Sequence, residues 1–428
     1  MSDMKDLVED LLKVYISSID SNNAIIMQNI NDKYTIIDKS MISAYLYVKI
    51  LNNLKIDEEI SKEVLLSYLI KQNIYGETGN LALEISNKER KNLYNEVLNH
   101  LVIEQFEYKN RILKNLKYNY KKIEKSKYSD LIEFCENIAE FYILDKLLKR
   151  GNWEVLSYIN ALKNKFEIYL NSNTDISENL EKEKIKIYKL ILDEEFEKTE
   201  YYNLIQIALK LKDVYRYSTL TTVVPENVLF HQYSMTVVNI VFADYMISKG
   251  EKINKYKLIC KTLFHDFGEY KGNEIVAQIK LYNEETKAMF AEIEENDEKE
   301  LEKLLGKDIY NIISGYKNGK EGYIADILDK ILGIMKLWIE VGYMNNYTYI
   351  KSLCSVYQER FAKFKNIDRI KELNDKEFLL EFLKNAYVYI KENLVNANFK
   401  ILSIYFTKEE IENFKIEINN LKKLRFLE

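Results

Sequence analysis

The scarcity of helix-breaking residues constrains this chain more than any other feature of its sequence. It contains a single proline, Pro225, and 12 glycines among 428 residues. Long segments rich in Leu, Ile, Lys and Glu carry apolar residues at spacings of three and four, the pattern of helices that bury one face. The sequence therefore predicts an all-α fold with helix over almost the whole chain.

Length and charge limit the classes of function. A chain of 428 residues exceeds one typical core and indicates two or three domains, and a hydrophobic content of 47% is ample for burial. The net charge is only −5, with 62 basic against 67 acidic residues, and provides no strong field for attracting nucleic acid or a membrane. We expect a small-molecule partner and no nucleic acid.

Cysteines and apolar runs bear on the compartment. Cys135, Cys260 and Cys354 are scattered and form no CxxC pair. The first residues carry neither the basic nor the apolar region of a signal peptide. No apolar run approaches the ~18 to 20 residues that span a bilayer. The sequence predicts a reduced, cytoplasmic protein that does not enter a membrane.

Histidine is rare, with three residues in the chain, and two of these lie in successive predicted helical segments. His265 is followed directly by Asp266, and His231 lies at the start of the preceding predicted helix. Imidazoles and carboxylates suit Mn, Co, Fe, Ni or Zn. Neighbouring helix positions diverge by about 100°, so the pair can share an ion only at a seam between helices. Glu269, four residues after His265, shares its predicted helix face and is a candidate acid or base.

The order of these residues resembles the HD-domain metal-dependent phosphohydrolases, whose signature is a first His, an adjacent His-Asp pair and a distant Asp. The resemblance implies one divalent ion (Mn, Co, Ni, Fe, Zn or Mg) bound by His231, His265, Asp266 and Asp329. Asp326 is the alternative last ligand, three residues away on the same predicted helix face. Asp329 is preferred because the segment after it resembles the one that follows the family's aspartate.

Within this superfamily the chain most resembles the bacterial 5′-deoxynucleotidases, which hydrolyse deoxyribonucleoside 5′-monophosphates. Arg216 and Tyr217 begin fifteen residues before His231, where that branch has an Arg-Trp pair. Glu269 stands at the position of the catalytic glutamate of that branch. Glu274 stands where the branch has an aspartate when the two sequences are aligned without a gap. The resemblance implies that Glu269 and Arg216 act in catalysis. It also implies that Arg216, Tyr217 and Glu274 contact the substrate.

The activity implied is that of a phosphohydrolase acting on nucleotides through metal-activated water, most specifically a 5′-deoxynucleotidase-like phosphomonoesterase. An HD nuclease or a cyclic-nucleotide phosphodiesterase is the enzymatic alternative. A non-catalytic scaffold that binds a protein partner is the third hypothesis. Against a nuclease, the sequence has no basic groove signature, and its acidic net charge gives a polyanion little attraction.

The second half of the chain repeats landmarks of the first. Residues 327–332 match residues 143–148 at all but one position, and Ser234-Met235 echoes Ser40-Met41. The first half lacks the ligands, however: at the corresponding places it has Ile37, Lys71-Gln72 and, as the one candidate that remains, Asp145.

We therefore expect two tandem HD-domain-like helical bundles, the first without metal ligands. The predicted divisions are a degenerate domain over 1–170, a helical connection over 171–200, a catalytic domain over 201–365 and a C-terminal helical extension over 366–428. Because the deoxynucleotidases are commonly homodimers, the resemblance also implies a monomeric pseudo-dimer, in which the first copy replaces a second subunit.

Overall fold

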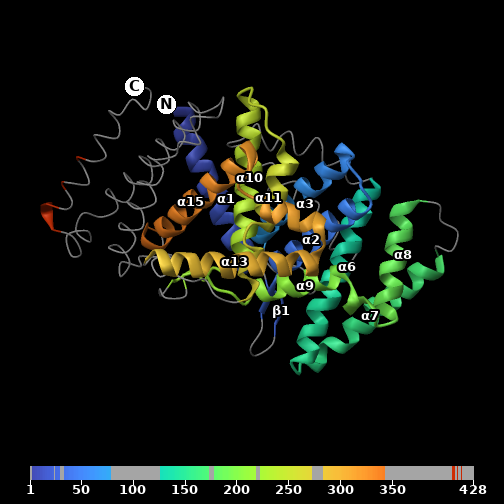
Figure 1. Ribbon diagram of the computed structural model, residues 1–428. Coiled ribbons are helices and arrows are strands. Elements are labelled where there is room, and N and C mark those ends of the chain that lie inside the picture. The colour runs from blue at the N-terminus through green and yellow to red at the C-terminus, as the bar shows by residue number, and fades with distance from the viewer. Residues whose placement is uncertain are drawn as a thin grey trace.

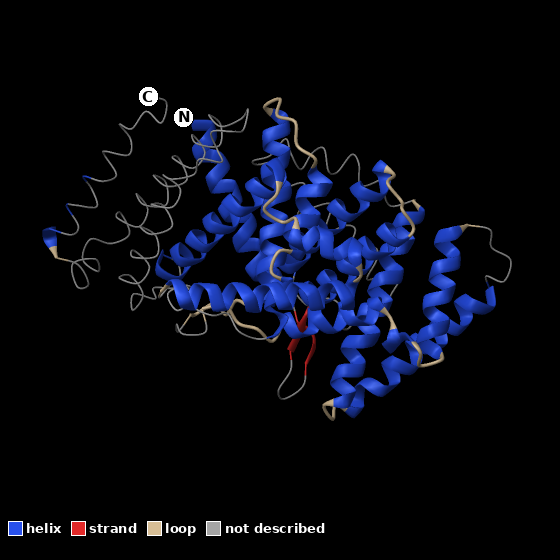
Figure 2. Cartoon of the chain, in the orientation of Figure 1, coloured by secondary structure: helices blue, strands red, loops and turns tan. Residues whose placement is uncertain are grey.

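The chain folds into helices that pack around a long central helix (Figure 1). The computed structural model describes residues 2–23, 25–28, 33–78, 126–172, 178–217, 222–271 and 283–342, with 407–409, 412 and 416. About 82% of it is helical, which confirms the predicted all-α class. Figure 2 shows the two short strands of a hairpin at one edge.

The first half contributes the hairpin and four of the packed helices. In chain order these elements are α1 (Ser2–Asn23), β1 (Ile25–Gln28), β2 (Lys33–Thr35), α2 (Ile36–Asn53), α3 (Glu59–Thr78) and α6 (Lys127–Lys149). Thr35 ends the hairpin and begins α2 as its N-cap, in a capping box with Asp38. Helices α2, α3 and α6 pack on one another.

A helical segment joins this part to the second half. It comprises η1 (Trp153–Val155), α7 (Leu156–Ser172), α8 (Asn179–Leu192), η2 (Phe196–Lys198) and α9 (Glu200–Leu211). In Figure 1, α7 and α8 lie to one side, away from α10. Stacked aromatic rings join them, with the Phe166 and Tyr188 centroids 4.3 Å apart.

The second half surrounds the central helix. Its elements are α10 (Val228–Ser248), α11 (Lys255–Phe264), η3 (Phe267–Lys271), α13 (Glu284–Leu305), α14 (Lys307–Ser314) and α15 (Gly319–Gly342). Every residue from Val228 to Ala243 is buried. A helix that is buried on all sides needs neighbours all round, and α10 contacts α1, α2, α3, α9, α11 and α15.

Helices of the two halves share one hydrophobic core. The hydroxyl of Tyr45 on α2 donates to Gln232 on α10 at 2.7 Å, and both are buried. The buried ammonium of Lys49 pairs with Asp308 on α14 and with Glu200 on α9, each at 2.6 Å. Because packing is continuous, it marks no boundary between two bundles. The tandem duplication and the domain divisions stay predictions.

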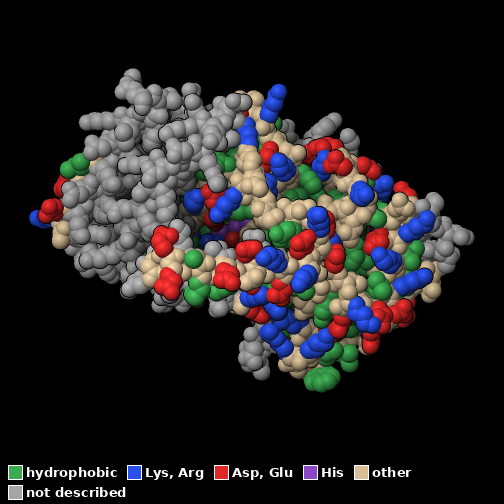
Figure 3. Space-filling model, in the orientation of Figure 1, with side chains coloured by type: hydrophobic (Ala, Val, Ile, Leu, Met, Phe, Trp, Pro, Cys, Tyr) green, Lys and Arg blue, Asp and Glu red, His purple; other side chains and the backbone are tan. Residues whose placement is uncertain are grey.

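The surface carries charges of both signs. Figure 3 shows Lys and Arg interspersed with Asp and Glu over the described part of one face, as the nearly balanced composition predicts. None of the described helices combines the length and the apolar character needed to cross a membrane.

Candidate metal centre

His231 occupies the first turn of α10. Asn227 is the N-cap of this helix: its Oδ1 accepts a 2.7 Å hydrogen bond from the backbone amide of Phe230. This bond fixes where the first turn begins. The imidazole is almost fully buried, at 1% exposure. Its Nδ1 lies 3.1 Å from Oε1 of Glu226, and its Nε2 lies 2.9 Å from Oδ1 of Asp329. A carboxylate therefore holds each edge of the ring.

His265 and Asp266 lie at the end of α11. The sequence predicted that they share a helix face with Glu269, but α11 ends at Phe264 and a 3-10 helix begins at Phe267. The turn between them is closed by the amide of Glu269, which donates to the carbonyl of Asp266 at 3.0 Å. The pair thus lies at a helix end, where both side chains can face one point.

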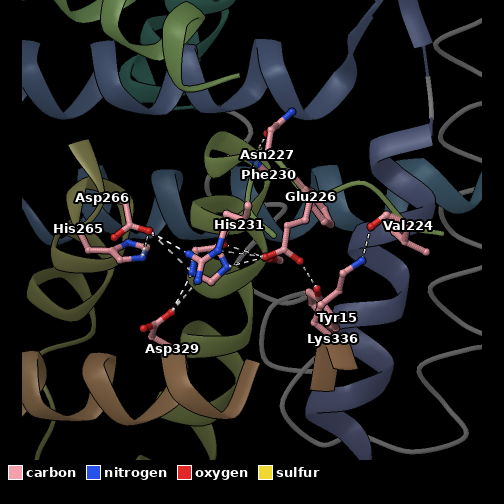
Figure 4. A network of polar contacts seen from close by, with 12 residues as sticks. Tyr15, Val224, Glu226, Asn227, Phe230, His231, His265, Asp266, Asp329 and Lys336 are labelled. Carbon is pink, nitrogen blue, oxygen red and sulfur yellow. Dashed lines mark hydrogen bonds and ion pairs between the residues drawn. The ribbon is translucent and has the colours of Figure 1, made fainter. Parts of the chain in front are cut away.

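Three helices bring the four predicted ligands together (Figure 4). One ligand atom each from His231, His265 and Asp329 lie within 4.8 Å of one another. Oδ2 of Asp266 is 3.0 Å from Nε2 of His265 and 4.0 Å from Nε2 of His231. The predicted seam between helices is thus formed by the start of α10, the end of α11 and the middle of α15.

The two aspartates of α15, Asp326 and Asp329, make different contacts. Asp329 contacts His231, whereas Asp326 pairs with Lys330 one turn further along the helix. Asp329 is the one of the two that joins the cluster of candidate ligands.

The donor set fits a divalent ion. The Nδ1 of His265 donates to the carbonyl of Thr262 at 2.7 Å, and that of His231 faces the Glu226 carboxylate. With both Nδ1 atoms held in this way, the Nε2 lone pairs are directed toward the aspartates, as in metal-ligating histidines. Two imidazole nitrogens and two carboxylates suit a borderline metal such as Mn, Co, Fe, Ni or Zn. HD-domain proteins usually bind a divalent metal.

Arg216 lies against three carboxylates of the site. Its Nη1 is 3.1 Å from Asp266, its Nε is 3.6 Å from Glu226 and its Nη2 is 3.9 Å from Asp329. Only 10% of its side chain is exposed. The guanidinium therefore offsets repulsion among these three acids and holds carboxylates from three segments in place.

These contacts shift the ionisation of the cluster. Burial opposes charge on every member, but His265 and Arg216 hold the pKa of Asp266 at about 2. Burial and Arg216 disfavour protonation of His231, yet its bonds to Asp329 and Glu226 raise its pKa to about 9. A divalent ion bound at Nε2 would displace this proton, because a metal-ligating imidazole is neutral. Burial likewise opposes charge on Glu226, but His231 and Arg216 lower its pKa to about 2. The acids are ionised at neutral pH, the state in which carboxylates bind metals.

Of the other predicted site residues, the structure describes Tyr217 and Glu269. The ring of Tyr217 lies with its centroid 5.9 Å from the guanidinium carbon of Arg216. Tyr217 has a φ of 58°, which a bulky residue rarely adopts and which is a form of strain often found at functional sites. Glu269 is partly exposed on the 3-10 helix. Glu274 lies outside the described residues.

Glu226 belongs to the site but was not predicted from the sequence. The signal was an acid directly before the N-cap Asn227 and five residues before His231. Its Oε2 accepts a 2.6 Å hydrogen bond from the hydroxyl of Tyr15 on α1. Tyr15, Glu226 and His231 are all at most 2% exposed, so this contact is shielded from water.

A buried ion pair on α15 anchors the segment that carries Glu226. Lys336 and Glu340 lie 2.8 Å apart, and both side chains are buried. The Glu340 carboxylate accepts hydrogen bonds from the backbone amides of Val223, at 2.8 Å, and Val224, at 2.9 Å. The ammonium of Lys336 donates to the Val224 carbonyl. The helix that supplies Asp329 therefore also fixes the approach to Glu226.

The counterparts in the first half have other contacts. Ile37 is fully buried in the core, and Gln72 is buried on α3. Asp145 pairs with Lys149 at 2.8 Å. The side chain of Lys71 lies outside the described residues.

A comparison with known families agrees with this site. Residues 200–385 match the family model described as 5′-deoxynucleotidase YfbR-like. The matched region contains α9 to α15 and all four predicted ligands. The YfbR-like family is one of HD-domain hydrolases, so the match supports a phosphohydrolase of this general type. It does not extend over the first half. No curated protein and no solved structure matches the chain.

Proposed function

We propose that the protein is a metal-dependent phosphomonoesterase that acts on nucleotides, most specifically on deoxyribonucleoside 5′-monophosphates. The observation that carries this proposal is the convergence of His231, His265, Asp266 and Asp329 beside Arg216, within a region that matches the YfbR-like family.

The four converging side chains would hold the ion. A divalent ion bound there lowers the pKa of water and neutralises charge on phosphate oxygens. Glu226 and the Thr262 carbonyl keep both imidazoles in the tautomer that presents Nε2. Arg216 keeps Asp266 and Asp329 charged and correctly placed before substrate arrives.

Glu269 would act as the general base or acid. It follows Asp266 by one 3-10 turn and is partly exposed. Its partner in this role would be a water molecule held next to the ligands. A carboxylate in this position accepts the proton of the attacking water and later returns it to the leaving oxygen. Arg216 would also contact the phosphoryl group by charge-assisted hydrogen bonds.

The charges near the site favour a small monoester over a polymer. Figure 3 shows histidine atoms near the centre of this face, and of the three histidines only His231 and His265 are described. Acidic and basic side chains border them, with no continuous basic track on the described part of this face. A nuclease needs such a track to follow a phosphate backbone. Tyr217, beside Arg216, would border the sugar or the base.

Phosphate release from a panel of esters tests the proposal. The purified chain, loaded separately with Mn²⁺, Co²⁺, Ni²⁺ or Mg²⁺, would be given deoxyribonucleoside and ribonucleoside 5′-monophosphates, a cyclic nucleotide and bis-p-nitrophenyl phosphate. We expect phosphate from the monophosphates and none in the Asp329→Asn variant. Cleavage of the diesters alone would favour the nuclease or cyclic phosphodiesterase, and no turnover with any metal would favour the scaffold.

We also propose that the first half is a degenerate copy, which makes the chain a monomeric pseudo-dimer. In support, α2, α3 and α6 pack on one another as α10, α11 and α15 do. The helix before each set also reaches the other half, since α1 packs on α10 as well as on α3, and α9 packs on α2 as well as on α10. Light scattering should give the mass of a single 50.9 kDa chain. A dimer packed through two catalytic copies would contradict this proposal.

A further inference from the structure

Tyr316 lies in the turn between α14 and α15, next to a predicted metal ligand. Its ring centroid is 5.2 Å from that of His265, and the two planes are tilted by 34°. The side chain is buried, at 9% exposure. Its hydroxyl nevertheless has no hydrogen-bond partner among the described residues. An unpartnered buried hydroxyl is costly, which makes this one a candidate contact for a ligand.

Three other buried tyrosines near the site differ from Tyr316, because their hydroxyls donate within the protein. The hydroxyls of Tyr15, Tyr45 and Tyr233 donate to Glu226, Gln232 and the carbonyl of Leu69, respectively. Tyr233 is the most useful comparison, because it lies on α10 two residues after His231 and its bond is internal to the protein.

The backbone of Tyr316 is fixed by two of the helices that supply the ligands. Lys261, one turn before His265, donates to the carbonyls of Gly315 and Tyr316, the latter at 3.2 Å. On α15, a Cβ at Gly322 would lie 2.1 Å from the Tyr316 carbonyl oxygen, so only glycine permits this approach. The position of the Tyr316 ring is therefore coupled to the positions of α11 and α15.

The Tyr316 hydroxyl can serve as a neutral donor beside the metal centre. A tyrosine hydroxyl carries one donor hydrogen and no charge. The ring lies against that of His265, whose Nε2 is 3.0 Å from Asp266. An uncharged donor at this place is suited to an anion that the aspartates would otherwise repel.

We propose that Tyr316 is a substrate-binding residue whose hydroxyl donates a hydrogen bond to a phosphoryl oxygen of the bound monophosphate. This inference rests on the proposed function and adds a residue that the sequence did not single out. A phosphoryl oxygen would satisfy the buried hydroxyl and add a contact that does not depend on Arg216, which is already engaged with carboxylates.

Calorimetric binding to a slow variant tests this role without relying on turnover. In a Mn²⁺-loaded Glu269→Gln background, Tyr316→Phe should weaken binding of 2′-deoxyadenosine 5′-monophosphate by about 3- to 10-fold, the effect of one hydrogen bond. Binding of 2′-deoxyadenosine, which lacks the phosphate, should not change. The affinity for Mn²⁺ should not change either, because the phenyl ring next to His265 is retained.

The melting temperatures of Tyr316→Phe and Tyr233→Phe provide a matched comparison. Tyr316→Phe removes a hydroxyl without a partner and should leave the melting temperature unchanged or higher. Tyr233→Phe leaves the Leu69 carbonyl unpaired, so it should lower the melting temperature and leave nucleotide affinity unchanged. A merely structural Tyr316 would give the opposite pattern, with lower stability and unchanged monophosphate affinity.

The possible failures can be told apart. If the wild-type chain releases phosphate but Tyr316→Phe weakens neither ligand or both equally, the inference is overturned while the proposed function stands. If the metal-loaded Glu269→Gln chain binds no monophosphate and the wild-type chain releases no phosphate, both are overturned.

Discussion

The hydroxyl of Tyr15 donates a 2.6 Å hydrogen bond to Glu226, which lies 211 positions further along the chain. Glu226 in turn faces Nδ1 of His231 at 3.1 Å (Figure 4). Helix α1 thus supports a predicted metal ligand through one carboxylate, although it lies outside the region that matches the YfbR-like family. The first half of the chain is part of the support of the site.

Removing this support should weaken metal binding. Replacing an outer partner of a ligating histidine typically costs about 10- to 100-fold in metal affinity, which we expect for Glu226→Gln. Tyr15→Phe removes only the bond to Glu226 and should cost less, about 3- to 10-fold. Calorimetric titration with Mn²⁺ measures both effects.

Tyr47→Phe is the control for Tyr15→Phe. Tyr47 is equally buried in the first half, but its hydroxyl donates to the Ser61 carbonyl at 2.8 Å, away from the site. This variant should lose stability and keep its affinity for Mn²⁺. Equal losses of affinity in both variants would show that Tyr15 acts only through general stability.

Glu269→Gln should separate catalysis from metal binding. Loss of a general acid or base typically slows turnover by about 10²- to 10⁴-fold, and the metal content should stay that of the wild type. Phosphate release and elemental analysis on the same preparations measure the two effects. Glu300→Gln, on α13 beside Lys271, is the control and should be as active as the wild type. Full activity of Glu269→Gln would remove this residue from the mechanism.

Asp38 should make stability depend on pH. It is fully buried, and burial raises its pKa from 3.8 to about 6. Because the folded state holds this proton more tightly, the contribution of Asp38 to stability is present below about pH 4 and is lost as pH rises through 6. A shift of about two units corresponds to about 3 kcal/mol.

Asp38→Asn should therefore gain stability relative to the wild type as pH rises from 4 to 7. Urea unfolding at several pH values measures the difference. Asp57→Asn, at a side chain that is 89% exposed, should leave the pH dependence as it is in the wild type. Parallel pH profiles for Asp38→Asn and the wild type would contradict this prediction.

The sequence predicted the fold class and the residues that converge, for reasons that are local. One proline and few glycines leave most of the chain free to form helix. The spacing of His231, His265-Asp266 and Asp329 is visible without knowing how the helices pack, and the structure brings these side chains together.

Contacts between distant segments were not predictable in this way. No pattern in the sequence connects Tyr15 with Glu226 or places Tyr316 beside His265. The burial of the Lys336–Glu340 ion pair was also not predictable. Oppositely charged residues four apart on a helix usually form a solvent-exposed pair, and the sequence does not show that this face of the helix is buried. The predicted helix through Glu269 was wrong because the first glycine after Phe264 is Gly268, which lies inside the 3-10 helix and does not mark the end of α11.

Metal content of two aspartate variants tests the central claim most directly. Elemental analysis after Mn²⁺ or Co²⁺ loading and desalting should find one ion per wild-type chain. The same ion should be present in Asp326→Asn, whose side chain pairs with Lys330. It should be lost or strongly reduced in Asp329→Asn, which removes the carboxylate facing His231. Equal metal content in the wild type and Asp329→Asn, or no metal in any of the three proteins, would contradict the account.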